Sequence, residues 1–154
     1  MSLHDLIDND AIIASLRVTS KKQALQEISE RASAVANLPA REIFDALLQR
    51  ERLGSTGVGG GIAIPHGKLP RVTHMIGLFA RLEKPIDYEA LDGEPVDLIF
   101  LLLAPEAAGA DHLKALSRVA RALRDPSLTA RLRATKDASG LYLLLTQNPA
   151  HHAA

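Results

Sequence analysis

The first third of the chain contains one apolar run followed by stretches with helical spacing. Residues 11–18 are mostly apolar, and we expect a strand there. Ser20 and Gln23 have the spacing of a capping box, in which each side chain bonds a free backbone N–H of the first helical turn. A helix is therefore expected from this point. Its predicted buried face consists of Leu25, Ile28, Ala32 and Val35.

A second helix is expected to follow directly. Asn37-Leu38-Pro39 breaks the first helix, and Pro39 suits the first turn of the next one. Gly54 marks the expected C-terminal end. The predicted buried stripe is Ile43, Phe44, Leu47 and Leu48. Residues 54–67 then hold six of the ten glycines in the chain, and we expect a loop, a short strand at 62–64 and a second loop.

The second half predicts two strands followed by helices. Strands are expected at residues 75–81 and 96–104, and the latter run is apolar almost throughout, which is typical of a strand buried on both faces. A helix is expected after Gly109. Its predicted buried face is Leu113, Leu116, Ala120 and Leu123. Asp125-Pro126 ends it and opens a short helix, and residues 141–145 favour a last helix.

These elements predict one α/β domain over residues 1–147, with a central sheet covered by helices. The length of 154 residues agrees with a single domain. Residues 148–154 are expected to form a frayed tail. The start of the chain does not resemble a signal peptide, and the longest apolar run, 98–105, is far shorter than the roughly 20 residues of a membrane span. We therefore expect no membrane insertion.

Composition excludes several classes of function. Lys plus Arg and Asp plus Glu both number 18, so no net field attracts nucleic acid. With two Tyr, three Phe and no Trp, the chain also has few side chains on which bases could stack. The absence of Cys excludes disulfides, thiolate zinc sites and Cys nucleophiles, and it agrees with a cytoplasmic location.

The cluster of glycines in residues 54–67 is the first sign of a binding site. Consecutive N–H groups without side chains can form a cradle for an anion such as phosphate, and the alternative is a tight loop without a ligand. A Walker A motif fails because Ile62 stands five residues before Gly67-Lys68 and Leu69 follows Lys68. A dinucleotide fingerprint starting at Gly57 fails at the same Ile62. No recognised metal-ligand spacing occurs either.

His66 is the candidate nucleophile that remains. It lies between Pro65, which restricts the backbone, and Gly67, which leaves one side open. A neutral imidazole nitrogen near pH 7 can attack phosphorus and form a phosphohistidine, for which the protein supplies positioning and charge stabilisation. The alternative is a loop histidine with an ordinary hydrogen bond.

Two further residue types could assist such chemistry. His112 lies beside Asp111 in the first turn of an expected helix, where the helix dipole favours an anion, and it could donate to a phosphoryl oxygen. The alternative for His112 is a histidine that faces solvent. Arg50 and Arg52 end the second helix, and Arg binds phosphate in bidentate fashion; the alternative is a charge that merely suits a helix C-terminus.

The stretch from Gly54 to Lys68, Gly-Ser-Thr-Gly-Val-Gly-Gly-Gly-Ile-Ala-Ile-Pro-His-Gly-Lys, resembles the active-site segment of phosphotransferase-system IIA domains of the fructose, mannitol and nitrogen-regulatory type. The resemblance is greatest to the nitrogen-regulatory type and covers nearly the whole chain. It includes the piece from Ser20 to Leu25, Pro95-Val96-Asp97-Leu98, and His112-Leu113 with Leu116-Ser117. Gly60 departs from the family pattern, where a polar residue such as Asn is expected.

The resemblance implies a mixed sheet flanked by helices and a phosphorylated His66. It also implies that His112 and Arg50 stabilise the phosphoryl group, and that a small HPr-like histidine phosphocarrier protein donates it. Phosphoenolpyruvate is then the ultimate source, with no bound cofactor. The residues expected to contact phosphate are Ser55, Thr56, Gly59, Gly60, Gly61 and Gly67. Asp111 is expected to raise the proton affinity of His112.

Three functions stay open at this point. In a regulatory phosphocarrier, the phosphorylation state of His66 decides which downstream regulatory protein is bound. In a sugar-transport IIA component, His66 passes the group to a IIB domain, and the Gly-Ser-Thr-Gly form favours the regulatory type over this one. In a binding module, His66 is never phosphorylated. A metal hydrolase that uses His66 and His112 lacks a carboxylate ligand at any recognised spacing.

Overall fold

A computed structural model describes residues 3–147 of the chain. The predicted tail at 148–154 lies outside the described residues. The core of the fold is a six-stranded mixed sheet, in which the strands follow the order β1-β5-β6-β3-β2 and β4 pairs with β6 beyond β3. Strand bounds are β1 Ile7–Leu16, β2 Gly57–Gly59, β3 Ile62–Ala63, β4 His66–Leu69, β5 Ile76–Ile86 and β6 Val96–Pro105. The prediction of a sheet flanked by helices is confirmed.

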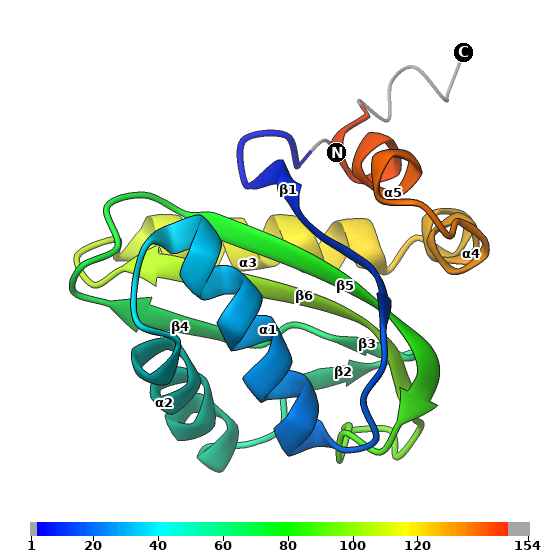
Figure 1. The fold of residues 1–154 in the computed structure, drawn as a ribbon, viewed down its shortest axis with the longest axis horizontal. Coiled ribbons are helices and arrows are strands. Elements are labelled where there is room, and N and C mark those ends of the chain that lie inside the picture. Colours follow the sequence, from blue (N-terminus) through cyan, green and yellow to red (C-terminus); the bar gives the residue numbers. More distant parts are fainter. Residues whose placement is uncertain (1–2, 148–154) are drawn as a thin grey trace.

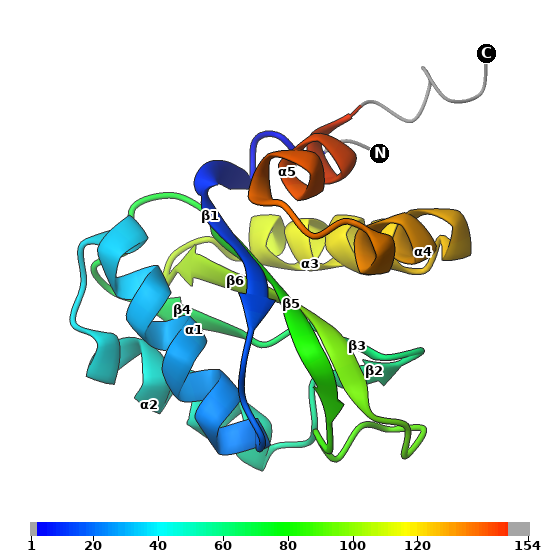
Figure 2. The ribbon, with the colours of Figure 1, turned by 45° about the vertical axis from the view of Figure 1, so that its right-hand side comes forward.

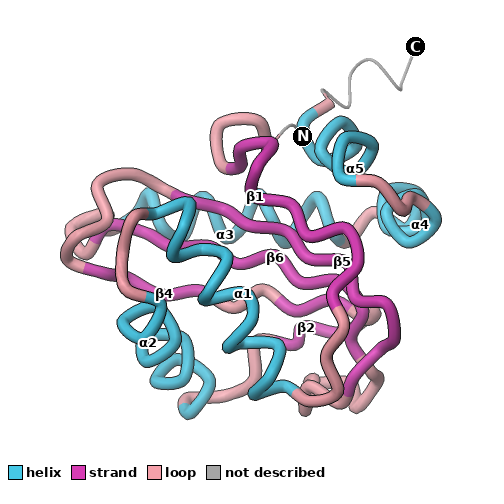
Figure 3. Tube along the Cα trace, viewed as in Figure 1, coloured by secondary structure: helices cyan, strands magenta, loops and turns pink. Residues whose placement is uncertain are grey.

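Helices cover both faces of this sheet (Figures 1 and 2). Helices α1 and α2 lie on one face, and α3 crosses behind the sheet, as the tube in Figure 3 shows. Helix α5 packs against β1, and α4 bridges α3 and α5. Helix bounds are α1 Lys21–Ala36, α2 Ala40–Arg52, α3 Ala110–Leu123, α4 Pro126–Ala134 and α5 Ala138–Thr146. None of the helices between residues 3 and 147 has the length and hydropathy of a bilayer span.

Strand β6 is the centre of the architecture. It pairs with β5 antiparallel along one edge, and along the other edge it pairs in parallel first with β3 and then with β4. All its residues from Leu98 to Ala104 are buried, which confirms the prediction of a strand covered on both faces. Because β3 and β4 follow one another on the same edge of β6, the residues between them are held against a rigid strand.

The start of α1 confirms the predicted cap with one change. The Ser20 hydroxyl accepts from the backbone N–H of Gln23 at 3.1 Å, as expected. The Gln23 side chain returns to the backbone N–H of Thr19, at 2.8 Å, and not to that of Ser20. Helix α1 ends at Asn37, which adopts a left-handed φ of 57°. Pro39 lies one position before α2, as its N-cap, and not inside the first turn.

Several predicted bounds differ from those observed, and each difference has a local cause. Strand β1 begins at Ile7, before the expected start, because a register shift lets the polar residues 8–10 join the strand. Strand β5 extends through the polar segment 83–85 to Ile86, which pairs with Val96. The glycine-rich segment forms the three short strands β2, β3 and β4. Leu113 is 68% exposed, because the adjacent residue of α3 takes the buried position.

Candidate functional site

His66 is the first residue of β4, where it pairs with Leu102 of β6. The preceding carbonyl, that of Pro65, accepts from the Leu102 N–H at 3.0 Å, so the backbone on either side of the ring is fixed to the central strand. Nδ1 of His66 lies 2.8 Å from the carbonyl oxygen of Ile64. A carbonyl can only accept, so Nδ1 carries the proton in this contact. The neutral ring therefore presents the lone pair of Nε2 to its surroundings.

Arg50 occupies the last turn of α2 and faces that lone pair. Its Nε–H donates to Nε2 of His66 at 3.2 Å, and its Nη1 donates to the carbonyl oxygen of Gly54 at 2.9 Å. The second contact closes the turn that follows the helix. A permanently charged, planar donor is thus held directly at the nucleophilic nitrogen. Sequence reasoning placed Arg50 at the site, and the geometry agrees with that placement.

His112 lies beside His66. The centroids of the two rings are 5.5 Å apart, and the ring planes are inclined by 52°. His112 is 6% exposed, so the alternative of a solvent-facing histidine is wrong. Within residues 3–147, its Nδ1 is buried and has no hydrogen-bond partner. A buried nitrogen with unused hydrogen-bonding capacity is rare in native structures and is typical of functional sites.

These three residues line one pocket of about 350 Å³. Its walls come from α2, the start of β4 and the first turn of α3. The lining consists of Ala46, Gln49, Arg50, Leu53, His66, Gly67, Lys68 and His112. The pocket therefore combines an imidazole lone pair with two side-chain cations, which is a suitable setting for an anionic group.

Both histidines are held in their neutral form. Burial lowers the pKa of His66 below its ordinary value, and the neighbouring Arg50 charge lowers it further, against the opposing effects of the Ile64 carbonyl and Glu51. Burial also lowers the pKa of His112, and the Lys68 charge, together with the charge that His66 would carry if it were protonated, acts in the same direction. The expectation that Asp111 raises the proton affinity of His112 is wrong, because the pKa of His112 is lowered, chiefly by burial, and Asp111 is not among the groups that shift it.

The structure brings one of the six predicted phosphate contacts, Gly67, to the pocket of His66. The hydroxyl of Ser55 is used locally: it accepts from the Gly57 N–H at 3.0 Å and donates to the Tyr88 carbonyl at 3.2 Å. Both the N–H and the hydroxyl of Thr56 donate to the carboxylate of Glu51. These two residues shape the entry into β2, and they do not line the pocket.

The other three predicted contacts are Gly59, the last residue of β2, and Gly60 and Gly61, which form the turn to β3. The Gly60 N–H donates to Asp92 at 3.0 Å, and the Gly60 carbonyl accepts from Arg133 at 2.7 Å. All three glycines have positive φ: 106° at Gly59, 67° at Gly60 and 82° at Gly61. A Cβ at Gly61 would lie 2.5 Å from Nη2 of Arg133. The tight-turn alternative therefore explains these glycines.

Sequence reasoning missed three residues of this region: Lys68, which is the second cation of the pocket, Leu53 and Glu51. Leu53 lines the pocket although it is 84% exposed, and its signal is a large apolar residue among the charged residues that end α2. Glu51 lies directly after Arg50, with a side chain that is only 6% exposed. Its signal was available: an acidic residue in the last turn of a helix opposes the helix dipole and so requires a specific partner.

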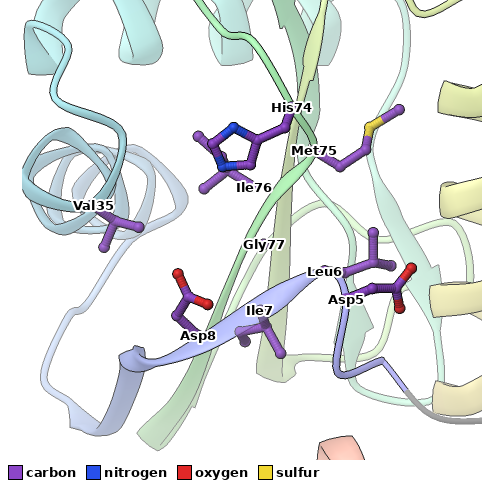
Figure 4. A pocket seen from close by; sticks show the side chains of 9 residues that line it. All are labelled: Asp5, Leu6, Ile7, Asp8, Val35, His74, Met75, Ile76 and Gly77. Carbon is purple, nitrogen blue, oxygen red and sulfur yellow. The ribbon is translucent and has the colours of Figure 1, made fainter.

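Several acidic residues and one histidine lie outside the pocket of His66. The carboxylates of Asp87 and Asp92 accept from the backbone N–H groups of Glu89 and Glu94, so these acidic pairs stabilise turns. His74 lies with Asp5 and Asp8 around a small hollow of about 80 Å³ between β1 and β5 (Figure 4). No group of three or more metal-ligating side chains occurs in the part of the chain from residue 3 to 147.

Comparison with known proteins adds a family to this geometry. The family model described as "Phosphoenolpyruvate-dependent sugar phosphotransferase system, EIIA 2" matches residues 5–148. A "Nitrogen regulatory protein" of Bradyrhizobium diazoefficiens is 56% identical over 150 residues, which cover 97% of this chain and 98% of that protein. Another of the same name, from Escherichia coli K12, is 43% identical over 147 residues, 95% of this chain and 90% of that protein.

A solved structure agrees with these relatives. The crystal structure of the nitrogen regulatory protein IIA-Ntr from Neisseria meningitidis superposes with a TM-score of 0.87 at 36% sequence identity. The match covers 92% of this chain and 97% of that one. The similarity thus extends from sequence to fold, over almost the whole length of each protein.

Proposed function

Because the chain belongs to the EIIA 2 family of the phosphoenolpyruvate-dependent sugar phosphotransferase system, we propose that Nε2 of His66 accepts a phosphoryl group from an HPr-like histidine phosphocarrier protein. One observation carries this proposal: Nδ1 bonds the Ile64 carbonyl at 2.8 Å, which leaves Nε2 as the nucleophilic nitrogen, in a pocket with Arg50 and Lys68. The phosphoryl group originates from phosphoenolpyruvate, and the proposal requires no bound cofactor.

The transfer step uses the groups already in place. The lone pair of Nε2 forms the new P–N bond, and the P–N bond of the donor breaks, so that its electron pair returns to the donor imidazole. Nδ1 keeps its proton and continues to donate it to the Ile64 carbonyl, which fixes the ring throughout. As Nε2 gives up its lone pair, Arg50 loses its acceptor, and its N–H groups turn to the phosphoryl oxygens.

The rest of the pocket complements the new charge. Phosphorylation adds about −1.5 to −2 charges. The side chains of Arg50 and Lys68 are the cations that line the pocket. His112, whose buried ring lies 5.5 Å from that of His66, adds an N–H donor for a phosphoryl oxygen. Such preorganised donors account for a large share of the stabilisation in phosphoryl transfer.

The surface around the pocket suits a protein donor. Leu53 at the pocket edge is 84% exposed, and Leu113, the neighbour of His112, is 68% exposed. Exposed large apolar residues next to a reactive group are typical of the centre of a protein interface. The same surface would meet a downstream partner, so a change of about two charges at its centre decides which partner binds.

Of the functions that remained open, the regulatory role has the most support. The relatives in Bradyrhizobium diazoefficiens and Escherichia coli are both named nitrogen regulatory proteins, and the chain matches nearly all of each. We therefore propose that this protein regulates downstream proteins according to the phosphorylation state of His66. Phosphoryl donation to a IIB domain in sugar transport is the second candidate, because the family as a whole belongs to a sugar phosphotransferase system.

The experiment is a phosphoryl-transfer assay read by intact mass. The protein is mixed with phosphoenolpyruvate, enzyme I and the carrier protein, and its mass is recorded at alkaline pH. We expect the gain of one phosphate, no gain in His66→Ala, and a slower gain in His112→Ala. Absence of any gain with cognate carriers would contradict phosphoryl acceptance, and the protein would then be a binding module. Transfer onward to an isolated IIB domain would favour the sugar-transport role instead.

A further inference from the structure

A buried polar cluster includes the residue that follows Arg50 in the chain and lies outside the pocket lining. It consists of Lys21 at the start of α1, Glu51 in the last turn of α2, Thr56 before β2, and Tyr88 in the loop after β5. The side chain of Glu51 is 6% exposed and that of Lys21 is 16% exposed. None of the four lines the pocket of His66. The transfer step described above therefore does not use this cluster directly.

Glu51 is the centre of the cluster. Its Oε1 accepts from Nζ of Lys21 at 2.9 Å and from the backbone N–H of Thr56 at 3.0 Å. Its Oε2 accepts from the hydroxyl of Thr56 and, at 3.4 Å, from that of Tyr88. Burial, together with the carboxylate, raises the pKa of Tyr88, so the phenol keeps its proton and can donate. Nζ of Lys21 also lies 4.7 Å from the centroid of the Tyr88 ring.

Stability alone does not account for such an arrangement. Removing two charges from water costs several kcal/mol per ion, and well-packed apolar residues often stabilise a fold as much or more. An ion pair does, however, impose one geometry, because its partners tolerate little displacement. The cluster thus ties the last turn of α2 to three separate parts of the chain in a fixed orientation.

That orientation matters because Arg50 immediately precedes Glu51. Arg50 bonds forward to the Gly54 carbonyl, and Glu51 bonds forward to both donors of Thr56. The side chains of Arg50 and Glu51 therefore both hold the short turn from α2 to β2, and the guanidinium of Arg50 also contacts His66. If the contacts of the Glu51 side chain were lost, the turn would keep its backbone bonds from the N–H groups of Leu53 and Gly54. The Arg50–Gly54 bond would then be the side-chain contact left from the last turn of α2 to this turn, and it must be free to follow the phosphoryl group.

We propose that Glu51, neutralised by Lys21, is a positioning residue that directs the guanidinium of Arg50 toward Nε2 of His66. The inference rests on the proposed function, because it assigns Glu51 a part in phosphoryl transfer. Glu51 itself touches neither the phosphoryl group nor the donor protein. Its charge opposes the lowering of the His66 pKa, and its positioning effect passes through the backbone of the last turn of α2.

The test compares Glu51→Gln with Glu42→Gln, a matched change on the same helix. Glu42 pairs with Arg71 on the surface, so its loss removes an exposed ion pair of small effect. Two quantities are measured: kcat and KM for phosphoryl transfer from the phosphorylated carrier, and the NMR signal of the Arg50 Nε–H. A double variant, Lys21→Met with Glu51→Gln, removes both buried charges and keeps the test valid if the single variant folds poorly.

For Glu51→Gln we expect kcat to fall about tenfold, equivalent to about 1.4 kcal/mol, with KM within about twofold of the original. A KM effect is not expected, since the residue lies away from the docking surface. The Arg50 Nε–H signal should broaden or move to the position of a solvent-exposed arginine. In the double variant the melting temperature should recover while kcat stays low. Glu42→Gln should change none of these quantities appreciably.

Recovery of both melting temperature and kcat in the double variant would overturn the inference, because Glu51 would then act through fold stability alone. So would an unchanged kcat in a folded Glu51→Gln protein. If the unaltered protein accepts no phosphoryl group, the proposed function fails, and the Arg50 signal decides the positioning separately. A signal lost in Glu51→Gln then supports positioning, and an unaltered signal contradicts it.

Discussion

The two ends of the glycine-rich segment differ in how completely their polar groups are hydrogen-bonded. In the turn between β2 and β3, both polar groups of the Gly60 backbone are bonded, to Asp92 and Arg133. At the start of β4, Arg50 donates a hydrogen bond to the Nε2 lone pair of His66. Among the described residues, the buried Nδ1 of the neighbouring His112 has no hydrogen-bond partner. The first region has its hydrogen bonds satisfied and is a part of the scaffold. The second has capacity left for an anion.

This contrast teaches that glycine density alone does not locate a site. The φ of 82° at Gly61, and the side chains of Arg133 and Asp97 that an added Cβ would force to shift, account for this glycine with no need for a ligand. At His66 the informative feature is a set of polar groups whose bonds are incomplete or readily exchanged. Substitutions in the two regions should therefore separate stability from chemistry.

The largest effect is expected at Arg50. Arg50→Gln removes the charge that meets the phosphoryl group, and we expect kcat for phosphoryl acceptance to fall about a hundredfold, as for the loss of one oxyanion-stabilising donor. The melting temperature should change little. Arg52→Gln, an exposed arginine on the same helical turn, is the matched control and should transfer at nearly the original rate. A comparable loss in both variants would mean that general charge, and not the contact with His66, is responsible.

At Gly61 the opposite pattern is expected. Gly61→Ala places a Cβ 2.5 Å from Nη2 of Arg133 and 2.9 Å from Oδ1 of Asp97, at a φ of 82°. We expect the free energy of unfolding to fall by about 1–3 kcal/mol, while the folded protein accepts phosphate at nearly the original rate. Chemical denaturation and the mass assay measure the two quantities.

Gly93 supplies the control for that variant. It has a φ of 75° but nothing within 4 Å of an added Cβ, so Gly93→Ala carries backbone strain without the clash. Its loss of stability should be clearly smaller than that of Gly61→Ala. If Gly61→Ala instead kept its stability and lost phosphoryl acceptance, the turn would belong to the site after all, as the glycine pattern alone suggested.

The smallest effect is the pH dependence of the site. The neutral form of His66 is the nucleophile, and the pKa of His66 lies below its ordinary value because of burial and the Arg50 charge. The rate of acceptance should thus stay level as pH falls to about 6.5, the ordinary value, and decline only below it. Titration of the His66 ring by NMR should give a midpoint below that of an exposed histidine, and Arg50→Gln should raise this midpoint. A midpoint above about 6.5 would contradict the buried, neutral site.

Much of the fold follows from periodicity because each element has a strong local signal. The Ser20 cap, the apolar run of β6 and the helix from Ala110 to Leu123 are all readable in one dimension. The features that the sequence did not predict depend on contacts between segments that are distant in the chain. The polar residues of β1 join a strand only because β5 lies alongside, and Leu113 is exposed only because His112 packs inward.

The site was predictable in part for the same reason. His66 had a recognisable local setting, and the resemblance to the IIA family singled out His112 and Arg50. The structure brings all three together. The assignment of Gly59, Gly60 and Gly61 to the same pocket could not be tested without knowing that Asp92 and Arg133 bond that turn. Glu51 was overlooked because its partners Lys21 and Tyr88 are remote in sequence.

The central claim is that Nε2 of His66 is the atom that carries the phosphoryl group. The most direct measurement is the NMR spectrum of the phosphorylated protein with 15N-labelled histidine, in which coupling to phosphorus identifies the bonded nitrogen. The account predicts phosphorus on Nε2 of His66, with the Nδ1 proton still present and protected by the Ile64 carbonyl. Phosphorus on Nδ1 of His66, or on His112, would contradict it.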